Sequence, residues 1–147
     1  MNAFVTAGAG FLLAVLWFDL MFDVQAAGHD EMPEPALASI AAYYARVTTA
    51  ARPMNRLIAA VMAATLAAIV LEIAGTSEPG WLGWVSLALA LAAIALAALR
   101  TVPAAVRLGT RRDPPAVQGR LAGDILTQHA FEFAAIAAVI AAQLVAG

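Results

Sequence analysis

Four long apolar runs divide the chain, and each is bounded by charged residues or by a terminus. They cover residues 1–18, 57–71, 79–99 and 133–147. Because a helix of about 20 apolar residues crosses the hydrocarbon core of a bilayer, these runs predict four membrane-spanning helices. No segment alternates apolar and polar residues over about ten positions, as the strands of a membrane barrel would. The pattern therefore predicts an all-α, transmembrane four-helix bundle.

The amino-acid composition supports a membrane protein and argues against several functions. Of the 147 residues, 63% are hydrophobic and only 12% are charged, which is too little charge for a soluble domain of this size. We therefore predict a single integral membrane domain over residues 1–147, with spans at about 4–24, 54–73, 81–99 and 124–145. The absence of cysteine excludes disulfides, thiolate metal sites and thiol catalysis. A net charge of -2 gives no indication of nucleic-acid binding.

The arginines predict the orientation of the bundle. All eight basic residues are arginine, and they fall in the first and third connections between the runs: Arg46, Arg52, Arg56, Arg100, Arg107, Arg111, Arg112 and Arg120. Positively charged connections stay in the cytoplasm, so both of these are predicted to lie there. The second connection contains Glu78 and no basic residue, which places it outside. The N-terminus and the C-terminus are then both outside the cytoplasm.

A helical extension is predicted before the second span. The segment "AAGHDEMPEP" breaks the chain, and Pro35 suits the first turn of a new helix. Residues 36–51 have helical apolar spacing, typical of either an interfacial helix or a cytoplasmic extension of the second span. Tyr43 and Tyr44 are interpreted as interfacial anchors. Pro103 is expected just past the inner end of the third span.

Carboxylates lie unusually close to the apolar runs. Residues 133–147 extend only about 22 Å as a helix, so the last span must include the preceding turns with Gln128, His129 and Glu132. Asp19 and Asp23 are four residues apart and share one helix face. A charged group facing lipid costs several kcal/mol, so these residues should face the interior of the bundle. On the last span, one arc also carries two further polar residues, Asp124 and Gln143.

These residues predict a buried polar site in the inner half of the membrane, made by Asp19, Asp23, His129 and Glu132. Asp23 has a second interpretation, which we favour: an interfacial, hydrated carboxylate that pairs with Arg46, Arg52 or Arg56. Glu72 and Gln143, nearer the outer face, are interpreted as a polar contact or as water-exposed residues.

Four functions remain open from the sequence. The four site residues could ligate a divalent metal, although the arrangement differs from that of the known di-metal bundles. His129, Glu132 and Asp19 could instead act as acid and base on a small lipophilic molecule. The rivals are a proton-coupled small-molecule transporter and a non-catalytic membrane subunit. The predicted partners are the lipid bilayer, a lipophilic ligand, and either a second copy of the chain or a membrane partner subunit. Whether the protein is an enzyme is left open.

Three sequence patches carry a resemblance to a known group of proteins. They are "YYARVTTAARPMN" before the second span, "RTVPAAVRLGTRRD" after the third, and "LTQHAFEF" at the start of the fourth. Together with the order of the spans, they resemble the small four-span membrane proteins of the anthrone-oxygenase-like group. The resemblance covers most of the chain in layout. It implies binding of aromatic, lipophilic molecules or their oxygenation without a complex cofactor, and it assigns no catalytic role to a single position.

Overall fold

The structure, a computed structural model, describes residues 2–29, 31–50, 52–75 and 80–146. All regular secondary structure assigned to these residues is helical, which confirms the all-α class. Along the chain these elements are α1 (Asn2–Asp23), the 3-10 turn η1 (Val24–Ala26), α2 (Glu34–Ala45), the π-helical turn η2 (Arg46–Ala50), α3 (Arg52–Ala74), α4 (Trp81–Leu96), the π-helical turn η3 (Ala97–Thr101), α5 (Val102–Gly109) and α6 (Pro115–Ala146).

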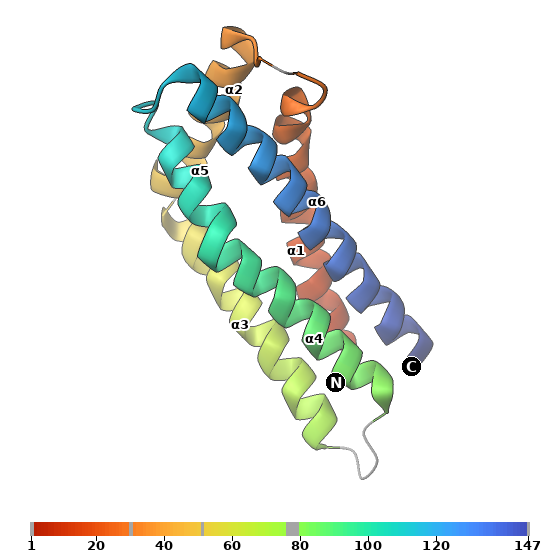
Figure 1. Cartoon of the computed structure of the whole chain (residues 1–147). Helices are drawn as coiled ribbons and strands as arrows, with labels where there is room; N and C mark the ends of the chain where they lie inside the picture. Colours follow the sequence, from red (N-terminus) through yellow and green to blue (C-terminus); the bar gives the residue numbers. More distant parts are fainter. Residues whose placement is uncertain (1, 30, 51, 76–79, 147) are drawn as a thin grey trace.

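Four stretches are long and apolar enough to cross a membrane. They are Asn2–Ala26, Pro53–Ala74, Trp81–Gly109 and Pro115–Val145, which supports a multi-pass membrane protein. The last stretch contains Gln128, His129 and Glu132, as its short uncharged run required. The described ends of the chain lie at the same end of the bundle (Figure 1). The second connection, with Glu78, lies outside the described residues.

The helix of the third predicted span, at about 81–99, continues past Pro103. The helix continues through η3 into α5, with Pro103 in the first turn of α5. At this point the Val102 N–H bonds to the carbonyl of Ala97, five residues back. This wider turn lies directly before the proline, which has no N–H of its own to donate. The result is one continuous helical stretch that extends beyond the predicted span.

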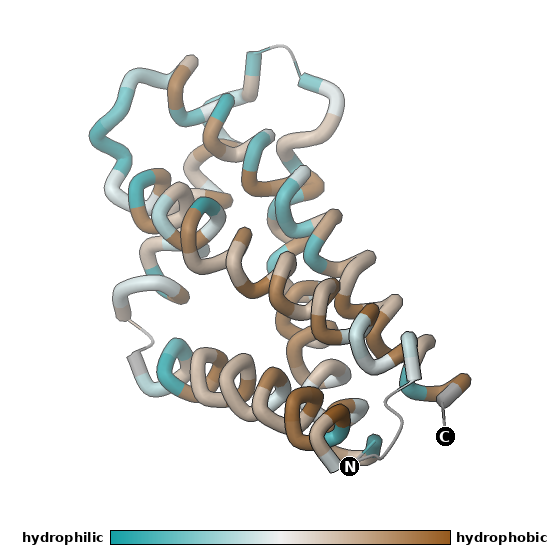
Figure 2. The backbone as a smooth tube through the Cα atoms, turned by 60° about the horizontal axis from the view of Figure 1, so that its bottom comes forward, coloured by the Kyte–Doolittle hydropathy of each residue, from teal (hydrophilic) through white to brown (hydrophobic). Residues whose placement is uncertain are grey.

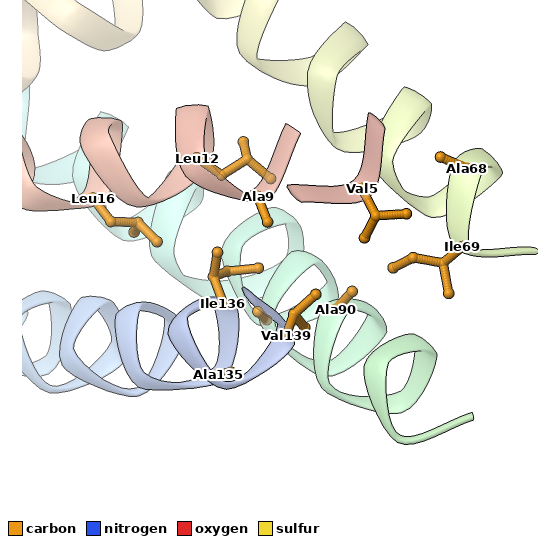
Figure 3. Close-up of a cluster of buried hydrophobic side chains, with 11 residues drawn as sticks. Val5, Ala9, Leu12, Leu16, Ala68, Ile69, Ala90, Ala135, Ile136 and Val139 are labelled. Carbon is orange, nitrogen blue, oxygen red and sulfur yellow. The ribbon is translucent and has the colours of Figure 1, made fainter. Parts of the chain in front are cut away.

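One apolar core holds the four long helices together. It lies among α1, α3, α4 and α6, and Figure 3 shows its side chains pointing toward one another. Gly8 of α1 lets that helix approach α3 closely, because a Cβ at this position would lie 2.2 Å from the Thr65 hydroxyl oxygen. Small residues allow such close helix packing in lipid. The buried members of this core are Val5, Ala9, Leu12, Leu16, Ala68, Ile69, Ala90, Ala93, Ala135, Ile136 and Val139.

A second core lies at the other end of the bundle. Here α2 packs against α5 and the first part of α6, and Leu37, Ile40, Leu108 and Ile125 are almost fully buried. Hydrophilic positions gather at this end (Figure 2). The predicted extension before the second span therefore packs on the bundle itself. Pro35 lies in the first turn of α2, as expected.

Between the two cores, the N-terminal half of α3 diverges from the other helices. Its described buried residues, Thr65, Ala68 and Ile69, all lie in its C-terminal half. Helix α3 packs against α1 and α4, and in the described part of the chain it has no comparable contact with α5 or α6. Apolar side chains in its N-terminal half, such as Met54 and Leu57, are about half exposed. This divergence opens space inside the bundle.

Candidate functional site

Asp23 and His129 form the centre of a buried polar cluster. Asp23 is the last residue of α1 and is fully buried, and His129 of α6 is 6% exposed. Nδ1 of His129 lies 2.6 Å from Oδ2 of Asp23. The hydroxyl of Tyr44, in α2, donates to the other oxygen, Oδ1, at 2.5 Å. Through its two oxygens, Asp23 therefore links α1 to α2 and to α6.

Asp19 lies one helical turn before Asp23 and has a tyrosine partner of its own. The hydroxyl of Tyr43 donates to Asp19 Oδ1 at 2.6 Å. The Tyr43 ring stacks on Phe22 with ring centroids 4.0 Å apart, which fixes its position against α1. Oδ2 of Asp19 is 3.9 Å from Nε2 of His129, within range of an ion pair but beyond a hydrogen bond. Asp19 thus faces the ring nitrogen that Asp23 does not contact.

The two tyrosines act as hydrogen-bond donors in this cluster. They belong to α2, outside the four candidate spans. Burial raises the pKa of both phenols, and the nearby carboxylates Asp19 and Asp23 raise it further. Both hydroxyls therefore stay protonated at neutral pH and donate hydrogen bonds to the carboxylates.

Glu132 is held by a different neighbour. It lies in α6, 3% exposed, one turn after His129. The Thr101 hydroxyl donates to Glu132 Oε1 at 2.6 Å. Thr101 is the last residue of the π-helical turn η3, so this irregular turn directs a donor at the carboxylate. π-Helical turns of this kind are frequent at functional sites.

A cavity of about 600 Å³ joins these groups. Its volume is in the range of small-molecule sites, which span roughly 300–1,000 Å³. Its polar lining residues are Asp19, Tyr43, Tyr44, Thr48, Asn55, Thr101, His129 and Glu132. Most of the remaining lining is apolar and comes from α1, α3, η3 and α6, including Leu12, Leu16, Ile58, Met62, Ala97 and Ile136. Asp23 is absent from the lining and lies behind His129.

The structure brings the four predicted site residues into one region, but it corrects the interpretation of Asp23. We expected an interfacial carboxylate paired with Arg46, Arg52 or Arg56. Asp23 is instead fully buried, and its partners are Tyr44 and His129. The reason is that α2 and α6 close over the end of α1 and exclude water there. Distance from the middle of a span does not measure burial when other helices cover its end.

Tyr43 and Tyr44 were also misinterpreted, because they are partners of the carboxylates rather than interfacial anchors. Sequence reasoning missed Thr101 altogether. For the two tyrosines, the sequence offered one weak signal, namely that a buried tyrosine hydroxyl needs a hydrogen-bond partner. Nothing in the spacing of residues 43 and 44 relates them to residues 19 and 23. These contacts depend on the return of α2 along α1.

The other predicted polar residues lie outside the cluster. Asp124 is exposed. Gln143 is 3% exposed, and its amide nitrogen lies 3.5 Å from the Ser86 hydroxyl at the opposite end of the bundle. The interpretation of Gln143 as a polar contact is therefore correct, and its exposure to water is excluded.

The described residues contain no group of three or more His, Asp or Glu side chains arranged to hold a metal ion. Oxygens of the proposed ligands Asp19, Asp23 and Glu132 accept hydrogen bonds from tyrosine and threonine hydroxyls instead.

Fold and site together define a class: a helical bundle with four candidate membrane spans and a polar cluster beside an apolar cavity. Comparison with protein-family models, with curated proteins and with solved structures gives no match. The resemblance to the anthrone-oxygenase-like group therefore stays a prediction that rests on short sequence patches.

Proposed function

We propose that this membrane protein binds a small lipophilic molecule in the cavity and exchanges a proton with it through His129. The observation that carries the proposal is the cavity itself, in which apolar walls meet His129, Glu132 and Asp19 at one place. Buried ionisable groups are costly in a membrane protein and are usually kept for function. An apolar ligand body would pack along α1 and α3, with its polar group beside α6.

The contact with Asp23 gives His129 a defined role. An ionised Asp23 can only accept, so the proton of a neutral imidazole lies on Nδ1, the nitrogen that contacts it. Nε2 is then a free base on the other side of the ring. Because His129 lines the cavity and Asp23 does not, Nε2 is the nitrogen available to a ligand. Asp23 is a positioning residue in this scheme, and His129 moves the proton.

The exposure of the lining indicates how a lipophilic molecule enters. Phe18 of α1, Met54 of α3 and Val102 of α5 line the cavity, yet each is at least half exposed on the side of the bundle. These positions lie within candidate membrane spans. We therefore expect the ligand to enter sideways from the bilayer, past the diverging half of α3.

Two neighbouring alanines of α3 provide a matched test. Ala59 lines the cavity and Ala60 does not, and both are exposed. Binding of 1-adamantanol, a compact neutral apolar probe, would be measured by calorimetry on protein in nanodiscs, with empty nanodiscs as background. Ala59→Phe should weaken binding by about tenfold or more, because the new ring occupies the cavity. Ala60→Phe should bind like the wild type. Equal effects of the two changes would overturn the proposal.

The role of His129 has a separate test. His29 and His129 are the two histidines of the chain, so His29→Gln leaves one imidazole signal. Nitrogen-15 NMR of that ring should show a protonated Nδ1, and Asp23→Asn should change the tautomer balance. A ring with a bare Nδ1 in the His29→Gln protein would contradict the assignment of Nε2 as the base.

A further inference from the structure

The cavity contains more negative than positive groups. Asp19 and Glu132 line it and Asp23 lies next to it, and His129 is the single basic group that the described residues place against these three carboxylates. Asp23 and His129 satisfy each other across 2.6 Å. A charged imidazole would balance one carboxylate and leave the other two uncompensated. Carboxylates that share a low-dielectric site repel each other, so such a site favours a bound cation or proton.

The described arginines do not supply that positive charge. None of the described residues that line the cavity is arginine. The ion pairs of Arg107 with Asp113 and of Arg111 with Glu34 lie near the polar end of the bundle, away from the cluster. An anionic ligand would therefore meet carboxylates with no arginine among the described lining to receive it.

Glu132 has an acceptor that the described protein does not use. Its Oε1 accepts from Thr101, while Oε2 receives no hydrogen bond from the described residues. The side chain is 97% buried and lines the cavity. Among the described residues, Asp19 Oδ2 likewise accepts no hydrogen bond, and Nε2 of His129 lies 3.9 Å from it. Oε2 of Glu132 and Oδ2 of Asp19 are thus two carboxylate oxygens at the cavity that can accept hydrogen bonds from a ligand.

From this charge balance and these acceptors, we infer that the ligand is a lipophilic amine, bound in its protonated form with the ammonium between Glu132 and Asp19. The inference rests on the proposed function and narrows its ligand class. An ammonium group donates up to three hydrogen bonds and carries the missing positive charge. Its apolar body fits the lining from α1 and α3.

Three probes with one cage and different polar groups test the inference: 1-adamantanamine, 1-adamantanol and 1-adamantanecarboxylate. At pH 7 the first is a cation, the second is neutral and the third is an anion. Their binding to the wild-type protein would be measured in nanodiscs of neutral phosphatidylcholine, which avoids attraction of the cation to lipid. The amine should bind about tenfold or more tightly than the alcohol, as a charge-assisted hydrogen bond predicts. The carboxylate should not bind measurably.

Variants of the two carboxylates test whether they cause the tighter binding of the amine. Glu132→Gln should reduce the advantage of the amine over the alcohol by about tenfold, because it removes the charge and keeps the shape. Asp19→Asn provides a second removal of charge should the first variant fold poorly. Asp124→Asn, an exposed change on the same helix, is the matched control and should leave the advantage unchanged.

The outcomes separate this inference from the proposed function. Equal binding of amine and alcohol would overturn the amine, and so would binding of the carboxylate as tight as that of the amine. Either result keeps the lipophilic site if Ala59→Phe still weakens binding. An amine preference that survives both Glu132→Gln and Asp19→Asn would also overturn the inference. Failure of all three probes to bind would overturn both proposals.

Discussion

The two halves of the bundle are built differently. In the half that we call the closed half, α1, α3, α4 and α6 approach closely around the first apolar core, and small residues lie at the contacts. A Cβ on Gly83 of α4, for example, would lie 3.1 Å from Ile73 of α3. In the other half, the cavity half, α3 diverges and the polar cluster lines the space that it leaves.

This difference suggests how the protein tolerates a polar cavity. Close packing in the closed half fixes the helix positions without help from the cluster. The second core around α2, α5 and α6 holds the opposite end. The cavity lies between two packed regions, so its carboxylates can be arranged for a ligand while packing elsewhere provides stability. The following tests address this division, from the largest expected effect to the smallest.

The orientation of the two halves is tested by an all-or-none measurement. The chain has no cysteine, so single cysteines can be placed at Thr76, outside the described residues, and at Thr110, after α5. On intact cells an impermeant thiol reagent should label Thr76→Cys and not Thr110→Cys, because we expect the arginine-rich connections to stay inside. Labelling of Thr110→Cys alone would reverse the orientation and place the cavity half outside.

Removal of Asp23 should have the largest effect on stability. Asp23→Ala leaves the Tyr44 hydroxyl and His129 Nδ1 without their buried acceptor, and we expect a loss of about 3 kcal/mol or more. Chemical denaturation in detergent would measure it. In a double-mutant cycle, Asp23→Ala and His129→Ala should together cost less than their sum, by about 1–3 kcal/mol. If Asp23→Ala behaves like the exposed change Asp124→Ala, the buried cluster does not exist as described.

The second core is tested at Gly109, where α5 meets α2. A Cβ there would lie 2.8 Å from the backbone nitrogen of Ala45, and a backbone atom cannot move aside as a side chain does. Gly109→Ala should therefore destabilise the protein by about 1–3 kcal/mol. Gly123→Ala, with nothing within 4 Å of the new Cβ, should be neutral or slightly stabilising, since alanine favours helix. Thermal unfolding of the two variants would compare them, and equal midpoints would show that α5 and α2 are not in contact.

The smallest effect is expected for the exposed ion pair of Arg107 and Asp113. The hydrogen bonds and charge of Arg107 lower the pKa of Asp113 from its ordinary value of 3.8. The contribution to stability is then present above pH 3.8 and disappears as the pH falls through the folded-state pKa. Asp113→Asn should change stability little at pH 7, because exposed pairs are screened by water. The difference from wild type should vanish at lower pH, and a difference that grew on acidification would contradict this assignment.

Much of the fold could be predicted from the sequence, because it depends on local pattern. The apolar runs predicted the number and approximate position of the four candidate membrane spans, and the shortness of the last run required α6 to include His129 and Glu132. Helical spacing placed Asp19 with Asp23 on one face. Each of these inferences needs only the length and periodicity of a single helix in a bilayer.

What only the tertiary structure decided are the relations between helices. Tyr43 and Tyr44 meet Asp19 and Asp23 because α2 returns along α1, and Thr101 reaches Glu132 because a π-helical turn rotates it toward α6. The burial of Asp23 and the cavity follow from where α2 and α3 lie relative to their neighbours. Residues far apart in a chain come together only through packing of whole helices, and helix periodicity carries no information about that packing.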